Sequence, residues 1–137
     1  MTTRVPILSL KDIRKSYGPV AVLHGVDFEV YPGEVVALLG ENGAGKSTLS
    51  GIIAGSVQPS GGTMTWQGQP YAPANPREAL DSGVGLIHQE LRLLPHLTIA
   101  ENVFVGRYPM KAGRLDRKLM EERAHAGLQR LGLDISP

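Results

Sequence analysis

The chain has 137 residues, with 14 basic and 13 acidic side chains and no cysteine, a length typical of a single domain. The formal net charge of +1 gives no electrostatic reason to expect a nucleic acid as partner, and the lack of cysteine excludes disulfide frameworks and thiolate metal sites. Because no apolar run is long enough to span a bilayer and the N-terminus lacks the layout of a secretory signal, we expect a soluble cytoplasmic chain.

The first part of the chain predicts strands and then a strand–loop–helix unit. Apolar and polar residues alternate around Ser9 and again over Val26–Val30, which is typical of strands with one buried face. The run Val35–Leu39 is apolar without alternation, so we expect a strand covered on both faces. A glycine-rich loop follows it. The next helix is predicted by three apolar residues on one face and a glycine to end it, namely Leu49, Ile52, Ile53 and Gly55.

Shorter elements are predicted beyond this unit. Thr63–Trp66 is rich in strand formers and lies between turns. The run Asn75–Glu78 combines an N-cap residue, a proline at the first helical position and an acid in the first turn, so a short helix should begin there and end at Gly83. Val84–Ile87 then predicts a short buried strand.

The last part of the chain is predicted to be helical. Thr98 is expected to cap a helix over Ala100–Val105, whereas residues 106–113 have the composition of a loop. Gly132 would end a longer helix. Its apolar face would consist of Met120, Ala124, Leu128 and Leu131.

One segment carries recognisable chemistry. Nine of the 17 glycines lie between Gly33 and Gly68, and residues 40–47 match the phosphate-binding P-loop or Walker A pattern G-x-x-x-x-G-K-[ST]. The matching residues are Gly40, Glu41, Asn42, Gly43, Ala44, Gly45, Lys46 and Ser47. A strand predicted before the segment and a helix predicted after it are the context that the pattern requires.

The chemistry of a triphosphate explains these residue types. Glycines let consecutive backbone N–H groups turn toward the phosphates, and the N-terminus of the following helix adds its dipole. Lys46 would supply a positive charge near the β and γ phosphates, Ser47 a hydroxyl ligand for Mg²⁺, and Thr48 a further phosphate contact. The sequence therefore predicts a binding site first, since hydrolysis needs further groups that complete the metal shell and position a water.

Two neighbouring patterns are interpreted as structural. Ser60–Gly62 looks like the core of an ATPase signature loop, but it follows the P-loop helix directly and opens a strand, so we interpret it as a turn. Leu86–Glu90 ends in a carboxylate, yet two polar residues separate it from the apolar run, so we do not interpret it as a Walker B strand. The four histidines have no metal-ligand spacing.

Together with the preceding run Gly33–Leu39, the segment Gly40–Leu49 resembles the nucleotide-binding domain of ABC transporters. The resemblance implies an α/β fold: a P-loop NTPase core with an antiparallel β subdomain at the N-terminus and the start of a helical subdomain at the C-terminus. We expect the ATP-binding core to cover residues 1–90 and the incomplete helical subdomain to cover residues 91–137.

The resemblance also assigns roles outside the P-loop. Lys15-Ser16-Tyr17-Gly18 looks like the family's A-loop, so Tyr17 would stack on adenine; taken alone, it would be a half-exposed packing residue. Gln89 looks like the Q-loop glutamine, which would reach Mg²⁺ and the attacking water and act in catalysis with Lys46; taken alone, it is a polar residue at a strand end. ATP and Mg²⁺ are the implied cofactors.

Two further runs, Gly85–Leu91 and Leu94–Arg107, are similar to the ATP-binding subunits of bacterial monosaccharide importers of the ribose, xylose and galactose type. The resemblance implies an ATPase on the cytoplasmic face of the plasma membrane that couples ATP hydrolysis to sugar uptake. Its partners would be transmembrane permease subunits contacted through Gln89–Arg107, a second nucleotide-binding domain that supplies the signature loop and, indirectly, a periplasmic sugar-binding protein. Leu91–Leu97 could be core or docking surface, and we favour the docking surface.

Four motifs of the family have no counterpart in this sequence: the LSGGQ signature, the Walker B strand with its catalytic glutamate, the D-loop and the switch histidine. We therefore expect the chain alone to bind Mg-ATP and to be catalytically incomplete. Two alternatives stay open, an ABC-class ATPase with a duty outside transport and a truncated, non-catalytic nucleotide-binding module. The segment 91–107 and the near-neutral charge argue against the first.

Overall fold

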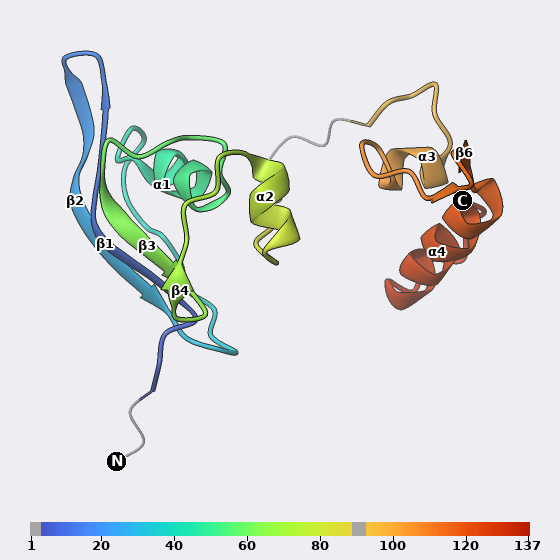
Figure 1. The fold of residues 1–137 in the computed structure, drawn as a ribbon, viewed down its shortest axis with the longest axis horizontal. Coiled ribbons are helices and arrows are strands. Elements are labelled where there is room, and N and C mark those ends of the chain that lie inside the picture. The colour runs from blue at the N-terminus through green and yellow to red at the C-terminus, as the bar shows by residue number, and fades with distance from the viewer. Residues whose placement is uncertain (1–3, 89–92) are drawn as a thin grey trace. The chain divides into compact units, whose positions relative to one another are not determined.

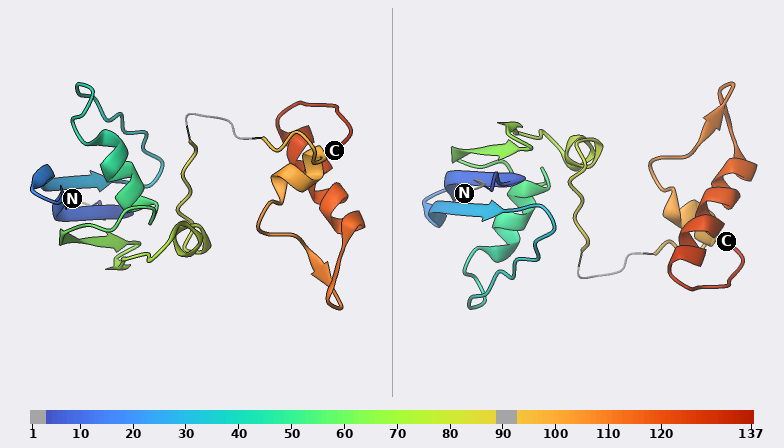
Figure 2. Two further views of the ribbon diagram at one scale, coloured as in Figure 1. Left: turned by 90° about the horizontal axis from the view of Figure 1, so that it is seen from above. Right: turned by 90° about the horizontal axis from the view of Figure 1, so that it is seen from below.

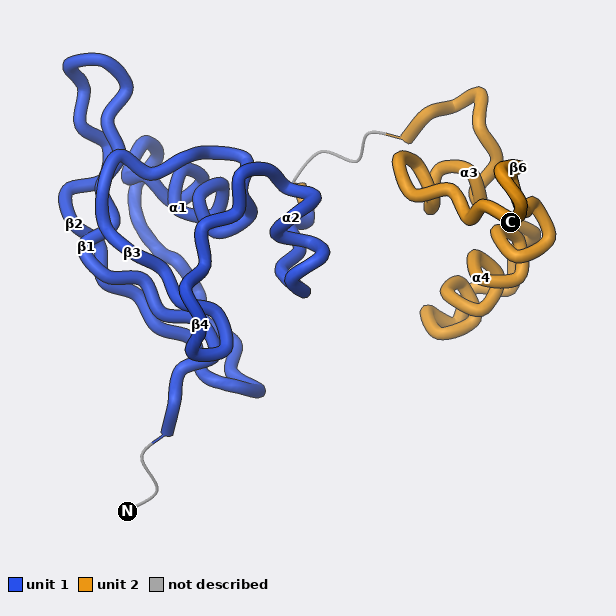
Figure 3. Tube along the Cα trace, in the orientation of Figure 1, with its two compact units in different colours: residues 1–87 blue, residues 88–137 orange. Residues whose placement is uncertain are grey.

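A computed structural model describes residues 4–88 and 93–137. The chain divides into two compact units, unit 1 with residues 1–87 and unit 2 with residues 88–137 (Figure 3). Each unit has a hydrophobic core cluster of its own. None of the helices in the described part has the length and the apolar composition that crossing a bilayer requires.

Unit 1 is built on an antiparallel sheet of four strands in the order β2–β1–β3–β4 (Figure 1). The strands are β1 (Leu8–Tyr17), β2 (Val20–Val30), β3 (Gly61–Trp66) and β4 (Gln69–Pro70). The first two form a long hairpin whose register runs from Leu8 opposite Val30 to Tyr17 opposite Val20. The strands predicted from alternation in the first thirty residues and from Thr63–Trp66 are therefore confirmed, and β1 and β2 are longer than the alternation indicates.

Helix α1 (Lys46–Ile53) packs on this sheet as its apolar face predicts (Figure 1). Leu49 and Ile52 are 4% and 1% exposed and belong to the same core cluster as Leu10, Ile13 and Met64 of the sheet. At the end of the helix, the N–H of Gly55 donates to Ile52 O and the N–H of Ser56 to Gly51 O, which is a Schellman motif with Gly55 at φ 73°. The predicted glycine stop is confirmed.

Helix α2 (Pro76–Asp81) begins where its capping residues predict. The Asn75 side chain accepts a hydrogen bond from the N–H of Glu78 at 3.0 Å, and the helix stops before Gly83. The indole N–H of Trp66 donates to Ser82 O at 2.9 Å, which ties the end of the helix to β3.

Two predicted strands are wrong. The structure assigns no strand to Val35–Leu39 or to Val84–Ile87, and the side chains of Val35, Leu39 and Ile87 are 97%, 90% and 93% exposed. A strand that is buried on both faces requires hydrogen-bonded neighbours on either side. In the part of the chain that the structure describes, neither segment has such a neighbour, so both are apolar runs left without a sheet.

The described residues of unit 2 form two helices and a short hairpin, shown in orange and red in Figure 2. Its elements are α3 (Ile99–Val103), β5 (Met110–Lys111), β6 (Arg114–Leu115) and α4 (Arg117–Arg130). The Thr98 cap is confirmed, but the helix is shorter than expected and the loop predicted over 106–113 contains the two-residue strand β5. Of the apolar face expected for α4, Met120, Ala124 and Leu128 are buried, whereas Leu131 is the C-cap and is 75% exposed.

Candidate functional site: the phosphate-binding loop

The Walker A segment folds as a tight turn that leads into α1. The N–H of Ala44 donates to Glu41 O at 3.2 Å, which closes a β-turn over residues 41–44. Gly43 stands third in this turn with φ 88°, a conformation that a residue with a Cβ adopts only at a cost. Glu41, Asn42, Gly43 and Ala44 are all exposed, so the turn presents its backbone to solvent.

Gly45 joins the turn to the helix and must be glycine for two reasons. Its φ is 87°, and a Cβ at this position would lie 2.6 Å from Leu23 Cδ2 and 3.3 Å from Val22 O. Both contacts are with β2, so the turn is seated directly against the β1–β2 hairpin, close to its tip. The absence of a side chain at residue 45 sets how closely the loop approaches the sheet.

The start of α1 offers donors to an anion. Gly45 caps the helix without a side chain to accept hydrogen bonds, and the first N–H groups of an α-helix have no partner within the helix. Lys46 Nζ donates to the carbonyl oxygens of Gly40 and Glu41, both at 2.7 Å, so its ammonium group is folded back over the turn. A positive side chain, free amides and a helix dipole therefore meet at one place, which fits a phosphate group.

The hydroxyl side chains that follow differ in exposure. Ser47 is exposed and Thr48 is half-buried, in the first turn of α1. An exposed hydroxyl next to a phosphate-binding turn fits the predicted Mg²⁺ ligand, because Mg²⁺ prefers oxygen ligands and keeps several waters. Gln89, the other predicted metal ligand, lies outside the described residues. Within those residues no three acidic or histidine side chains gather in a way that could hold a metal ion.

Tyr17 lies at the tip of the β1–β2 hairpin, opposite Val20, and its side chain is 51% exposed. Lys15 Nζ is 4.9 Å from the centre of the Tyr17 ring and donates a hydrogen bond to Gln58 O at 2.7 Å. The lysine therefore anchors the aromatic ring to the segment that follows α1, through a cation–π contact. The structure places Tyr17 on the same hairpin that packs against Gly45.

Sequence reasoning missed Lys15. The available signal is the i, i+2 spacing to Tyr17, because side chains two residues apart in a strand point to the same face, but no strand was predicted there. A basic residue beside an aromatic one on that face could have been recognised as a ring contact.

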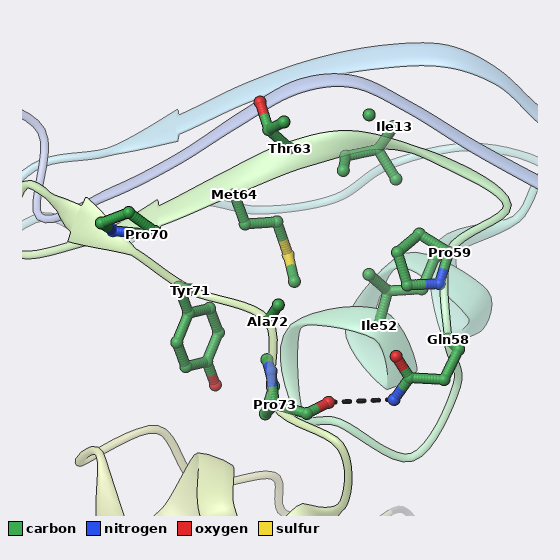
Figure 4. A pocket seen from close by; sticks show the side chains of 11 residues that line it. Ile13, Ile52, Gln58, Pro59, Thr63, Met64, Pro70, Tyr71, Ala72 and Pro73 are labelled. Carbon is green, nitrogen blue, oxygen red and sulfur yellow. Dashed lines mark hydrogen bonds between the residues drawn. The ribbon is translucent and has the colours of Figure 1, made fainter.

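A cavity of about 210 Å³ lies elsewhere in unit 1 and contains none of the Walker A residues (Figure 4). It is bounded by β3, by Ile52 of α1 and by the segment 70–73. Residues that line the cavity form two hydrogen bonds. Gln58 Nε2 donates to Pro73 O at 2.9 Å, and Tyr71 Oη donates to Ile53 O at 2.8 Å. Burial raises the pKa of Tyr71. This cavity is a gap in the core between α1 and the sheet, and it is distinct from the phosphate-binding loop.

In unit 2, the described part of the predicted docking segment exposes apolar side chains. Leu93 is 70% and Leu94 is 47% exposed. These exposures favour a surface over the alternative of a core for this part of the segment.

Known proteins resemble the chain over nearly its whole length. The family model described as ABC transporter matches residues 23–136. The ribose import ATP-binding protein RbsA of Geobacillus kaustophilus is 47% identical over 133 residues, 96% of this chain and 27% of that protein. The arabinose import ATP-binding protein AraG of Pectobacterium atrosepticum is 44% identical over 137 residues, 100% of this chain and 27% of that protein. The chain thus spans about a quarter of the length of these curated relatives.

The fold has a counterpart among solved structures. An ATP-binding cassette of an ABC transporter matches with a TM-score of 0.79 and 27% sequence identity, over 94% of this chain and 55% of that chain. This match confirms the expected α/β P-loop NTPase fold with its antiparallel sheet. On the family match, the sequence identities and the fold together, the chain belongs to the ABC transporter family.

Proposed function

We propose that the chain is the nucleotide-binding part of the ATPase subunit of an ABC importer for a monosaccharide. Nucleotide binding is supported by the geometry of the Walker A segment. Gly45 lets the turn approach β2 closely, and Lys46 lies over the turn beside the start of α1, which has no side-chain cap. The names of the relatives, which are ribose and arabinose import ATP-binding proteins, support the choice of a sugar importer.

Each predicted site residue of this chain would contact a different part of Mg-ATP. Lys46 would leave the carbonyl oxygens of Gly40 and Glu41, or share them, to donate to the β and γ phosphates. Ser47 would offer its hydroxyl to Mg²⁺, which when bound neutralises charge between the β and γ phosphates. Thr48 would add a phosphate contact. Tyr17, with its ring anchored by Lys15, would stack on the adenine.

Catalysis and coupling would involve the region around Gln89. As the resemblance to the family implies, Gln89 would complete the Mg²⁺ shell and orient the attacking water. The segment Gln89–Arg107 would contact the transmembrane permease subunits, a second nucleotide-binding domain would supply the signature loop, and a periplasmic sugar-binding protein would act indirectly. The subunit would be peripheral on the cytoplasmic face of the plasma membrane.

Titration of the 137-residue chain with Mg-ATP tests nucleotide binding. Lys46→Ala should weaken the affinity at least about thirtyfold, because hydrogen bonds from a charged group are lost. Lys118→Ala is the matched control: this side chain is 88% exposed and lies outside the motif, so its loss should leave the affinity unchanged. Equal affinities of the Lys46→Ala and unsubstituted chains would contradict the proposal.

Turnover and transport are tested separately. The 137-residue chain should bind Mg-ATP without steady hydrolysis, since none of its residues matches the Walker B glutamate. Steady hydrolysis that Lys46→Ala abolishes would contradict this expectation. In cells that depend on the full-length protein, Lys46→Ala should stop uptake of labelled ribose or arabinose. Copurification with membrane permease subunits separates an importer from an ATPase with a duty outside transport.

A further inference from the structure

The side chain of Asn102, in helix α3, gathers four hydrogen bonds to the backbone of the preceding loop. Its Oδ1 accepts from the N–H of Leu94 at 2.8 Å, and its Nδ2 lies 3.0 Å from Leu94 O, 3.1 Å from Leu97 O and 3.0 Å from Thr98 O. The amide nitrogen carries only two protons, so one of its three contacts is shared. Asn102 thus holds both backbone groups of Leu94, as two residues of an antiparallel sheet hold each other.

The loop that Asn102 holds is a β-turn with apolar side chains at its start. The N–H of Leu97 donates to Leu94 O at 3.1 Å, and Pro95 occupies the second position, which favours this turn. Leu93 and Leu94 are 70% and 47% exposed, and residues 93–98 contain no Asp, Glu, Lys or Arg. The turn therefore presents an apolar surface without formal charge, which fits an apolar segment of a partner protein.

Asn102 lies in a helix that is capped at its N-terminus and packed against α4. The capping box of α3 joins Thr98 and Glu101: the Thr98 hydroxyl accepts from the N–H of Glu101 at 3.1 Å, and the Glu101 carboxylate accepts from the N–H of Thr98 at 2.9 Å. Ala100 is 1% exposed and packs against Met120 of α4. The shape of the loop is consequently linked to the core of unit 2 through one carboxamide group.

We propose that Asn102 is a positioning residue for docking: its carboxamide holds residues 94–98 in the shape that presents Leu93 and Leu94 to an apolar segment of the permease. This inference rests on the proposed function. It assigns to Asn102 a role that requires both an acceptor and a donor at fixed places, which no other standard side chain of this size supplies.

Because the side chain at position 102 must donate hydrogen bonds, substitutions there should differ in how much they weaken docking. Asn102→Ala removes the four contacts and leaves the loop free to rearrange. Asn102→Asp keeps the size of the side chain but brings a carboxylate oxygen to the position of Nδ2, within 3.1 Å of three carbonyl oxygens, where the charges repel. Docking should therefore decrease from Asn102 to the alanine variant and further to the aspartate variant, although aspartate is the closer match in shape.

The test uses the full-length protein produced together with its permease subunits. The exchange rate of the Leu94 amide hydrogen reports the loop directly, because the Leu94 N–H donates to Asn102 Oδ1. In Asn102→Ala this exchange should be about fivefold faster, as expected for one lost hydrogen bond, and the yield of copurified permease should fall about tenfold. Unchanged protection of α4 amides shows that unit 2 stays folded, and unchanged affinity for Mg-ATP shows the same for unit 1. Lys118→Ala, at a side chain that is 88% exposed and lies outside the segment Gln89–Arg107, is the control and should change none of these values.

The outcomes separate the inference from the proposed function. Unchanged Leu94 exchange in Asn102→Ala would overturn the positioning role. Faster exchange with undiminished copurification of the permease, or an aspartate variant that docks better than the alanine variant, would overturn the docking role of the loop. Failure of the unsubstituted protein to copurify with a permease would overturn the proposed importer function and this inference with it, while leaving the Leu94 exchange result as a property of the fold.

Discussion

At Gly45 a backbone conformation and a close contact impose the same requirement. The residue has φ 87°, and any Cβ would overlap Leu23 Cδ2 at 2.6 Å. Lys46 is the next residue, so a displacement of Gly45 moves the ammonium group away from the carbonyl oxygens on which it lies. We therefore expect stability and nucleotide binding to be linked at this position.

Gly45→Ala should lower the free energy of unfolding of unit 1 by about 2–4 kcal/mol, from the left-handed backbone together with overpacking against β2. It should also abolish binding of Mg-ATP at concentrations that saturate the unsubstituted chain. Gly68→Ala is the matched control, because φ there is 75° but a Cβ would meet nothing within 4 Å. It should cost only about 1 kcal/mol and leave binding intact. Urea unfolding and titration with Mg-ATP measure both effects, and equal costs for the two variants would show that the contact with Leu23 is unimportant.

A second local network predicts how stability depends on pH. The Tyr31 hydroxyl donates to Glu29 at 2.9 Å and Lys11 lies 3.2 Å from the same carboxylate, which lowers the pKa of Glu29 and raises the pKa of both Tyr31 and Lys11. A carboxylate with a lowered pKa stabilises the fold above its unfolded-state pKa, and that contribution is lost as the pH falls through the folded-state value.

In Tyr31→Phe the largest cause of the Glu29 shift is removed, so the pKa of Glu29 should rise toward its ordinary value. The variant should consequently lose less stability than the unsubstituted chain when the pH is lowered from 7 to 3. NMR titration of the Glu29 carboxyl group and urea unfolding at both pH values measure the two effects. An unchanged Glu29 pKa would show that the hydroxyl does not act on the carboxylate.

At the scale of elements, helix ends are set by local chemistry that is readable from sequence. Helix α1 ends in a Schellman motif at Gly55, and α4 ends in another at Gly132, where the N–H of Leu133 donates to Leu128 O and that of Gly132 to Gln129 O. Gly127, in contrast, lies inside α4 with an ordinary helical φ, and a Cβ there would meet nothing within 4 Å.

Two glycine-to-alanine substitutions in α4 should therefore have opposite signs. Gly127→Ala should stabilise unit 2 by about 0.5–1 kcal/mol, because alanine loses less backbone entropy on folding. Gly132→Ala should destabilise it by about 1 kcal/mol, because φ is 72° at that position. Thermal and urea unfolding followed by signals from unit 2 give both values. Two changes of the same sign would contradict the assignment of the helix end.

At the scale of the whole molecule, two apolar runs have no strand neighbours among the described residues. The side chains of Val35, Leu39 and Ile87 are at least 90% exposed, although their segments have the composition of buried strands. The chain corresponds to about a quarter of the length of its curated relatives. We infer that strand neighbours for these two segments come from outside the described residues.

Ile87→Thr therefore should change stability differently in two contexts. In the 137-residue chain, where Ile87 is 93% exposed, the change should be within about 0.5 kcal/mol. In the full-length protein the cost should rise to about 1–3 kcal/mol, because a covered strand position would lose apolar burial. Ile52→Ala, at a side chain that is 1% exposed, should be costly in both contexts. Equal small effects of Ile87→Thr in both would show that the segment stays uncovered.

The sequence by itself determined the features that depend on neighbours along the chain. The capped starts of α2 and α3, the glycine stops of α1 and α4 and the Walker A turn all follow from residues within a few positions of one another. The same local patterns could not decide whether an apolar run finds a partner, so Val35–Leu39 and Val84–Ile87 were predicted as buried strands and are not.

The tertiary structure decided what depends on residues distant in sequence. It placed Val22 and Leu23 of β2 against Gly45, the Lys15 ammonium on Gln58 O, and the Asn102 carboxamide on the backbone of Leu94. Each of these contacts depends on how the chain returns on itself, which composition and periodicity do not record. The physical reason is that a strand or a loop needs a surface from a distant part of the chain to pack on. A cap or a turn forms its hydrogen bonds among neighbouring residues.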